Sequence, residues 1–288
     1  MIRDSQLLDS LSVSFGYISL WIFVFRKTTW SPFLSFTMAN YIDPANEHVA
    51  HAYDALYERD QRHLAVDAYM NSHLILEATN AHYVKLEKIL QDSLVAGLPD
   101  IACSRAQAKF LMLQARMSSS TNILEIGTLG GYSAAWLATA SKDAHVTTLE
   151  LDRDFARVAA ENVEAAGLSQ QIDIVIGPGL LSLTQLLDEV QKQERQPFDF
   201  VFIDANKQDN VAYFDLAMSL TKPHATIIVD NVVRNGKVAL ESEAAKDDRV
   251  LGTRQLIEAV GSNKAVDATV IQTVGEKNYD GSLLAMKV

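Results

Sequence analysis

The chain has 288 residues, 48% hydrophobic and 21% charged, a composition typical of a soluble globular protein. Its formal net charge of −11 argues against a nucleic-acid-binding protein, because binding to phosphate backbones requires a basic face. The single cysteine, Cys103, excludes an internal disulfide framework and a zinc site built from several thiolates. It is compatible with a reducing compartment, so we expect a cytoplasmic protein with a small-molecule partner.

The first 37 residues differ from the rest of the chain. An apolar stretch runs from Leu11 to Phe25 and is followed by Arg26 and Lys27. Its fifteen residues are short for a membrane-spanning helix, which needs about 20. It also lacks a basic segment before it and an evident small-residue cleavage site. An N-terminal extension unrelated to the fold, a membrane anchor and a targeting peptide all remain open, and we look for the fold in residues 38–288.

Helical patterns come first in that segment. Apolar residues recur at helical spacing from Pro44 to about Gly97. Ser104 and Gln107 then have the spacing of a capping box, which predicts a helix that continues through Met117. We expect these helices, within residues 44–118, to form an N-terminal helical cap.

Strand and helix patterns alternate after the cap. The expected strands are 122–127, 146–151, 172–177, 198–205 and 225–232, and the expected helices are 131–140, 153–166, 180–193, 209–220 and 249–260. Two more strands, 265–274 and 282–288, are joined by the turn-rich segment GEKNYDG, which predicts an antiparallel hairpin with Tyr279-Asp280-Gly281 in its turn. The pattern predicts an α/β fold, a doubly wound and mostly parallel sheet in a single domain, 38–288.

In such sheets, ligands bind beyond the carboxyl ends of the strands. Gly127, Gly130 and Gly131 follow the first strand and open a helix, where the backbone turns tightly. Glu150 ends the next strand, 23 residues after Gly127, a spacing suited to an acid that binds ribose hydroxyls. The pattern G-x-G-x-x-G is absent and Glu125 lies beside the turn, so a nucleoside cofactor with a cationic amino group is favoured over a pyrophosphate. The alternative is that the glycines serve only helix–strand packing and that Glu150 is merely solvated.

A second group of polar residues follows the next two strands. The strand in FDFVFIDANKQDN ends at Asp204, and the following strand ends at Asp230-Asn231. Because neighbouring strands lie about 4.8 Å apart, these oxygen donors could converge on one hard cation, such as Mg²⁺. A divalent ion there would favour the neutral amine of Lys207, which makes this lysine a candidate general base. Helix capping by the two aspartates and a solvated Lys207 are the alternatives.

Five segments match, in order, the motifs of a known family: ILEIGTLGGYSA, TTLELD, FDFVFIDANK, VDNVVRNGKV and GEKNYDGSLLAMK. They resemble the cation-dependent O-methyltransferases, the family of caffeoyl-CoA and catechol O-methyltransferases, from about residue 60 to the last residue. The resemblance implies a class I S-adenosylmethionine-dependent fold whose seven-stranded sheet has its last strand inserted antiparallel. It implies methylation of a vicinal aromatic diol, such as a catechol, flavonoid or hydroxycinnamate. Since related enzymes often dimerise, a homodimer is also an expectation.

The same resemblance implies roles for individual residues. Asp204, Asp230 and Asn231 resemble the metal ligands, Lys207 the base, and Asn235 a substrate contact. The residues expected at S-adenosylmethionine are Cys103, Glu125, Gly127, Thr128, Ser133, Glu150, Gly179 and Asp204.

The chain also departs from the family pattern. Asn206 replaces the aspartate usual in the plant enzymes, and Pro223-His224-Ala225 replaces a glycine pair before the fifth strand. Val233-Arg234 replaces the Leu-Trp of the plant enzymes, so their CoA-ester substrates are not implied. Two other functions stay open: a nicotinamide-dependent oxidoreductase, which needs a pyrophosphate site that this turn lacks, and a membrane-tethered binding module anchored by residues 1–37.

Overall fold

A computed structural model describes residues 62–76 and 82–288, which belong to one compact unit spanning residues 41–288. The expected extension 1–37 and the first part of the helical cap therefore lie outside the described residues. The helices in the described residues are α2 (Arg62–Leu74), α3 (Tyr83–Val95), α4 (Arg105–Met117), α5 (Tyr132–Ala138), α6 (Arg153–Ala166), α7 (Gly179–Gln191), α8 (Asn210–Leu220), α9 (Glu241–Ala244) and α10 (Asp248–Ser262). Two short 3₁₀ helices, η4 (Lys207–Asp209) and η5 (Lys237–Ala239), lie in the loops that follow β4 and β5.

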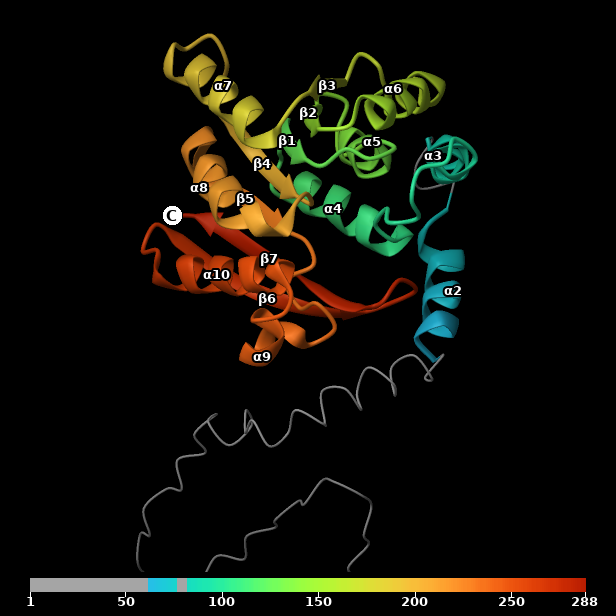
Figure 1. The fold of residues 1–288 in the computed structure, drawn as a ribbon. Helices are drawn as coiled ribbons and strands as arrows, with labels where there is room; N and C mark the ends of the chain where they lie inside the picture. Colours follow the sequence, from blue (N-terminus) through green and yellow to red (C-terminus); the bar gives the residue numbers. More distant parts are fainter. Residues whose placement is uncertain (1–61, 77–81) are drawn as a thin grey trace, which may run out of the picture. The chain divides into compact units, whose positions relative to one another are not determined.

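A seven-stranded sheet forms the centre of the unit (Figure 1). Its strands are β1 (Asn122–Ile126), β2 (His145–Glu150), β3 (Ile172–Ile176), β4 (Phe198–Ile203), β5 (Thr221–Val229), β6 (Val266–Val274) and β7 (Tyr279–Lys287). They lie in the order β3-β2-β1-β4-β5-β7-β6, and β7 is antiparallel to both of its neighbours. The predicted fold class, including the inserted antiparallel last strand, is confirmed.

Helices cover both faces of the sheet. On one face, α3, α4, α5 and α6 pack on strand residues that include Ile123, Phe200 and Phe202. On the other face, α7, α8 and α10 pack on the alternate strand residues, among them Leu124 and Val201. Both faces of the central strands are therefore apolar, as expected for a parallel sheet between two layers of helices.

The helix boundaries follow from local chemistry. The Ser104 hydroxyl accepts a hydrogen bond of 3.2 Å from the backbone N–H of Gln107, as the capping box predicted. The Asp152 carboxylate caps α6 in the same way, and Gly167 ends that helix with a φ of +75°.

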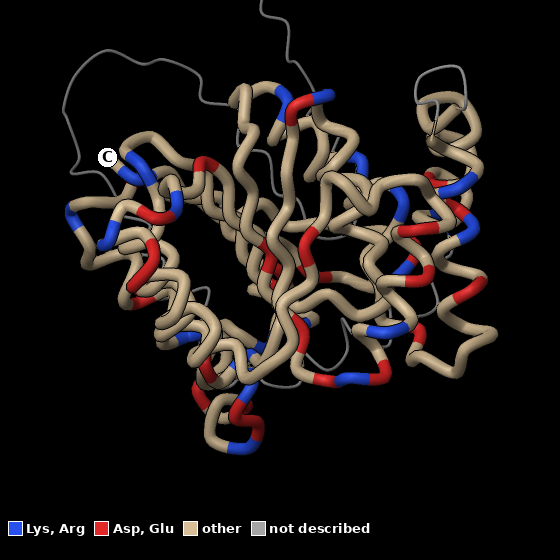
Figure 2. Tube along the Cα trace, turned by 90° about the horizontal axis from the view of Figure 1, so that it is seen from above, with Lys and Arg blue, Asp and Glu red and all other residues tan. Residues whose placement is uncertain are grey.

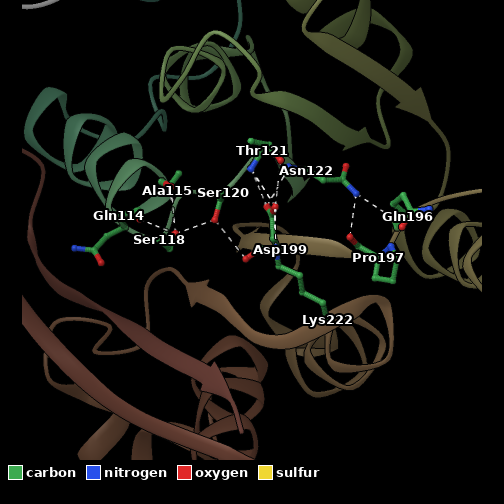
Figure 3. Close-up of polar contacts among 10 residues, drawn as sticks. All are labelled: Gln114, Ala115, Ser118, Ser120, Thr121, Asn122, Gln196, Pro197, Asp199 and Lys222. Atoms are coloured by element: carbon green, nitrogen blue, oxygen red, sulfur yellow. Dashed lines mark hydrogen bonds and ion pairs between the residues drawn. The ribbon is translucent and has the colours of Figure 1, made fainter.

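Asp199, the one charged residue within β4, lies near the start of the strand, whereas Asp204 follows its end. Figure 3 shows the polar contacts of Asp199. Its side chain is buried and accepts hydrogen bonds from the backbone N–H groups of Thr121 and Asn122, at 3.0 Å each for the shorter contacts. The Lys222 ammonium lies 3.4 Å from the same carboxylate. Asp199 therefore joins the beginnings of β1, β4 and β5. These contacts help to fix the register of the three strands. The register matters for function because a slip of one residue would turn every side chain of a strand to the other face of the sheet.

The fifth and the last strands differ most from the prediction, while the bounds of the other strands agree to within about two residues. The fifth strand covers Thr221–Val229 and ends before Asp230, and its pairing with β4 is interrupted where Phe198 pairs with Thr221 but Phe200 pairs with Thr226. The prediction that Tyr279-Asp280-Gly281 is only a turn is wrong. These residues begin β7 and pair with β6, because the hairpin turn is confined to residues 275–278.

In residues 62–76 and 82–288, no helix is long and apolar enough to cross a membrane, and the stretch 11–25 lies outside these residues. Figure 2 shows Lys and Arg interspersed with Asp and Glu along the described chain.

Candidate active site

The carboxyl ends of the central strands lie at one edge of the sheet. Beyond the strands, the backbone N–H of Gly127 donates to Leu149 (3.0 Å), that of Asp204 to Ile126 (2.8 Å), and that of Asp230 to Ile203 (2.9 Å). The turns that follow β1, β4 and β5 are therefore held side by side. The sequence-predicted residues of these turns come together in one region.

A cavity of about 1080 Å³ opens at this edge. Most of the predicted site residues line it: Cys103, Gly127, Thr128, Ser133, Glu150, Gly179, Asp204, Lys207 and Asn231. Glu125 and Asp230 are buried behind the lining, and Asn235 is exposed and outside it. The structure thus brings together all predicted cofactor and metal residues, but not the predicted substrate contact.

Gly127 shapes the turn after β1. Its φ is +105°, and a side-chain Cβ at this position would lie 2.1 Å from the carbonyl oxygen of Asp204. Only glycine fits, because both the backbone conformation and the space exclude a side chain. Gly127 is thus needed for the close approach of the ends of β1 and β4, whether or not a ligand is bound.

Glu150 connects the glycine turn to the loop after β2. Its two carboxylate oxygens accept hydrogen bonds from the backbone N–H of Leu129, at 2.7 Å, and of Asp152, at 2.9 Å. Each oxygen has a second lone pair, so the carboxylate can still accept hydrogen bonds from a ligand. The backbone bonds fix its position at the cavity wall.

Glu125 is fully buried beside the turn. The Thr148 hydroxyl donates to its Oε2 at 2.6 Å, while Oε1 has no hydrogen-bond partner within the described segments. Burial raises the pKa of Glu125 to about 8, although the Ser133 and Thr148 hydroxyls act to lower it. A buried carboxylate with one unpaired oxygen fits a cationic ligand group, which would satisfy Oε1 and favour the ionised form.

Lys207 is only 7% exposed, in the 3₁₀ helix η4. Its ammonium donates to Oδ1 of Asp204 at 2.7 Å. Close packing of α10 holds η4 in place, because a Cβ on Gly252 would lie 2.3 Å from the carbonyl oxygen of Lys207. Asn206, the departure from the family pattern, donates to Asp209 at 2.9 Å.

Asp230 and Asn231 follow β5, next to Asp204. Asp230 is 5% exposed and accepts a hydrogen bond of 3.1 Å from the Ser282 hydroxyl. Burial and the nearby Asp204 carboxylate raise the pKa of Asp230. A cation between the two carboxylates would relieve their repulsion, and an oxygen set of this kind fits a hard divalent ion. No cluster of three or more His, Cys, Asp and Glu that could hold a metal occurs in the described residues; the predicted set has only two such residues and an amide.

Sequence reasoning missed the residue that holds this loop, Asp280. It is 5% exposed, and its Oδ1 accepts hydrogen bonds from the backbone N–H groups of Val233 (3.0 Å), Arg234 (2.9 Å) and Gly281 (3.0 Å). A buried carboxylate that binds three backbone N–H groups substitutes for the missing partners of an irregular loop. No local sequence signal marks this role, because the two partners in the loop, Val233 and Arg234, lie 47 and 46 positions away.

Cys103 lies in the loop before α4 and lines the cavity. Burial raises the pKa of its thiol well above the ordinary value, and Asp230, Asp204 and Glu125 add to the effect. This direction favours the protonated thiol, which is a poor nucleophile and packs as a small apolar group.

Comparisons with known proteins agree with this geometry. The family model described as O-methyltransferase matches residues 77–288. An O-methyltransferase of Aspergillus flavus, imqG, is 41% identical over 230 residues, which cover 80% of this chain and 93% of that protein. A catechol O-methyltransferase of Mycobacterium tuberculosis is 40% identical over 222 residues, or 77% of this chain and 94% of that protein.

A solved structure is similar at the level of the fold as well. The O-methyltransferase of Bacillus cereus, in complex with SAH, has a TM-score of 0.72 and is 41% identical, covering 79% of this chain and 99% of that one. The family predicted from the sequence motifs is confirmed. The chain belongs to the O-methyltransferase family and is an enzyme with the class I fold of the S-adenosylmethionine-dependent methyltransferases.

Proposed function

We propose that the enzyme transfers the methyl group of S-adenosylmethionine to one oxygen of a vicinal aromatic diol, with the help of a divalent cation. One observation carries the proposal. Two aspartates and an asparagine follow the ends of adjacent strands, the lysine amine lies on one of the carboxylates, and the glycine turn opens into the same cavity.

The cofactor half of the proposal rests on the ends of β1 and β2. Glu150 would accept hydrogen bonds from the ribose hydroxyls, and the unpaired Oε1 of Glu125 suits the cationic amino group. Thr128, Ser133 and Gly179 complete the wall, with Cys103 in the loop above. The Bacillus cereus relative, whose structure contains SAH, supports this assignment.

The acceptor half rests on the ends of β4 and β5. Asp204, Asp230 and Asn231 would hold the cation, and Mg²⁺ is the ion that this oxygen set suits best. A bound divalent cation would lower the pKa of the diol hydroxyl that is methylated and fix the orientation of that hydroxyl. The catechol O-methyltransferase of Mycobacterium tuberculosis supports a diol as the acceptor.

The chain's own residues would accept the proton of the acceptor and align the two reactants. Lys207, as the free amine, would take the proton of the attacked hydroxyl, and the oxygen would then accept the methyl group with SAH as the leaving product. The cavity walls would hold the two reactants in line, so that positioning supplies much of the acceleration. Membership of the O-methyltransferase family favours this reaction over a nicotinamide-dependent one.

A methyl-transfer assay on the purified full chain tests the proposal. Catechols, flavonoids and hydroxycinnamates would each be incubated with S-adenosylmethionine, with Mg²⁺ or with excess chelator. We expect a monomethylated diol with Mg²⁺ and almost none with chelator. Thermal shifts should show stabilisation by S-adenosylmethionine and not by a nicotinamide dinucleotide. Full activity in chelator would contradict the cation, and stabilisation by the dinucleotide alone would contradict the cofactor.

The proposal includes a domain division. Residues 38–288 would form a single methyltransferase domain, with residues 1–37 as an extension that catalysis does not need. A chain that begins at Met38 should then keep the kcat/KM and the Tm of the full chain. Loss of activity on truncation would contradict the division. Fractionation and size-exclusion chromatography of both chains would show whether they are cytoplasmic and dimeric, and release from membranes on truncation would identify 1–37 as an anchor.

A further inference from the structure

The cavity contains many charged groups, and their pairing is nearly complete. Nine charged residues line it: Asp100, Arg105, Glu150, Asp204, Lys207, Arg234, Arg249, Glu276 and Lys277. Most pair with each other or with a neighbouring acid, at Lys277–Asp100 (2.6 Å), Lys207–Asp204 (2.7 Å), Arg249–Asp247 (2.8 Å) and Arg105–Glu87 (2.5 Å). Glu150 and Glu276 accept backbone N–H groups. In an acidic protein, cavity cations are thus mostly neutralised by partners.

Arg234 is the exception. It is half-buried at the cavity wall, and its guanidinium makes no hydrogen bond or ion pair with any residue in the described segments 62–76 and 82–288. A guanidinium has five N–H donors in a planar fork, which matches the two oxygens of a carboxylate. Arg234 acts electrostatically on Asp247, but that carboxylate is already paired with Arg249, so the guanidinium donors of Arg234 remain open to an anionic ligand.

The position of Arg234 assigns it to the acceptor. It lies three residues after Asn231, in the loop that follows β5, whereas the cofactor residues Gly127 and Glu150 belong to β1 and β2. In the sheet order, β5 and β2 are separated by β4 and β1. The loop that carries Arg234 thus lies on the β5 side of the cavity, next to the proposed metal ligands.

The backbone of the loop that carries Arg234 is also preorganised before any ligand binds. Arg234 has a φ of +55°, and its backbone N–H is bound by the buried Asp280 carboxylate at 2.9 Å. The next residue, Asn235, donates its backbone N–H to the carbonyl of Tyr279 at 3.1 Å. A side chain on such a fixed backbone loses less entropy when it binds, which increases the gain in affinity.

We propose that Arg234 binds a carboxylate on the acceptor, so that the enzyme prefers aromatic diols that carry an acid group over neutral diols of the same shape. The inference rests on the proposed function and narrows its substrate class. It also gives a role to the position where the plant enzymes carry tryptophan.

Two acceptors with the same diol test the preference: protocatechuate, which is an acid, and its neutral methyl ester. For the acid, Arg234→Gln should lower kcat/KM by roughly 10- to 100-fold, the effect of one hydrogen bond to a charged group. For the ester, the change should stay within about twofold, as for a neutral surface substitution. Comparing variant with wild type on each acceptor cancels the different reactivities of the two diols. Arg234→Lys should keep part of the preference, because it retains the charge but not the fork.

Lys237→Gln is the matched control. It removes the same charge from the same loop but lies outside the cavity lining, so kcat/KM should remain unchanged for both acceptors. An equal loss for the acid and the ester in Arg234→Gln would overturn the inference, and a weaker affinity for SAH in that variant would assign the arginine to the cofactor instead. If the wild type methylated neither acceptor nor any other diol, the proposed function itself would fail.

Discussion

Asp204→Ala should lower methyl transfer by roughly 1,000-fold or more, because a chelated cation supplies several kcal/mol to such a reaction. The variant loses one of the two carboxylates of the proposed cation site and the partner of Lys207. It keeps Glu125, Glu150 and the glycine turn, so S-adenosylmethionine should still bind. The measurements are kcat as a function of Mg²⁺ concentration and the Kd of SAH, both on the full chain.

Asp143→Ala provides the control for the charge change, since the Asp143 side chain is 65% exposed and lies outside the cavity. It should match the wild type in both measurements. If Asp204→Ala retained normal turnover and the same Mg²⁺ response, the cation would lie elsewhere. A large loss of SAH affinity would mean that Asp204 belongs mainly to the cofactor site.

Lys207→Met should lower kcat by roughly 100- to 10,000-fold with a much smaller change in KM, as expected when a general base is removed. Methionine keeps the length and the apolar part of this buried side chain, which limits the loss of packing. The residual rate should rise with pH as the diol ionises in solution, because the deprotonated acceptor no longer needs a base.

Lys142→Met serves as the matched control, because the Lys142 side chain is 88% exposed. Its pH profile should coincide with that of the wild type. A normal kcat in Lys207→Met at all pH values would remove this lysine from catalysis. A raised KM with unchanged kcat would show that it binds the acceptor and does not take its proton.

The elements of the fold were predictable where the sequence pattern is local. The runs 122–127 and 198–205 are apolar and bounded by turns, so strands and the polar residues at their ends could be placed to within two residues. The same holds for the Ser104 cap, which needs only residues three positions apart. Acids at the ends of parallel strands then point to one edge of the sheet, which is why the sequence could name residues that line the cavity at this edge.

The remaining features depend on contacts between distant residues. Asp280 looks like a turn residue in the sequence, and only the pairing of β7 with β5 places its carboxylate under the loop 231–236. Gly252 looks like an ordinary glycine within a helix, yet it allows α10 to approach the carbonyl of Lys207. Pro223-His224-Ala225 lies inside β5, where the register with β4 shifts, and no local pattern indicates such a shift.

The inserted strand β7 determines the order in which the two halves of the site can be assembled. Its residues Asp280 and Ser282 support the loop 231–236 and the carboxylate of Asp230, although they follow these residues by about 50 positions. On the ribosome, the glycine turn and Glu150 can therefore adopt their native arrangement before the loop after β5, which depends on β7 lying between β5 and β6. Pairings between such distant segments form slowly, so we expect the loop 231–236 to gain its support from Asp280 late in folding.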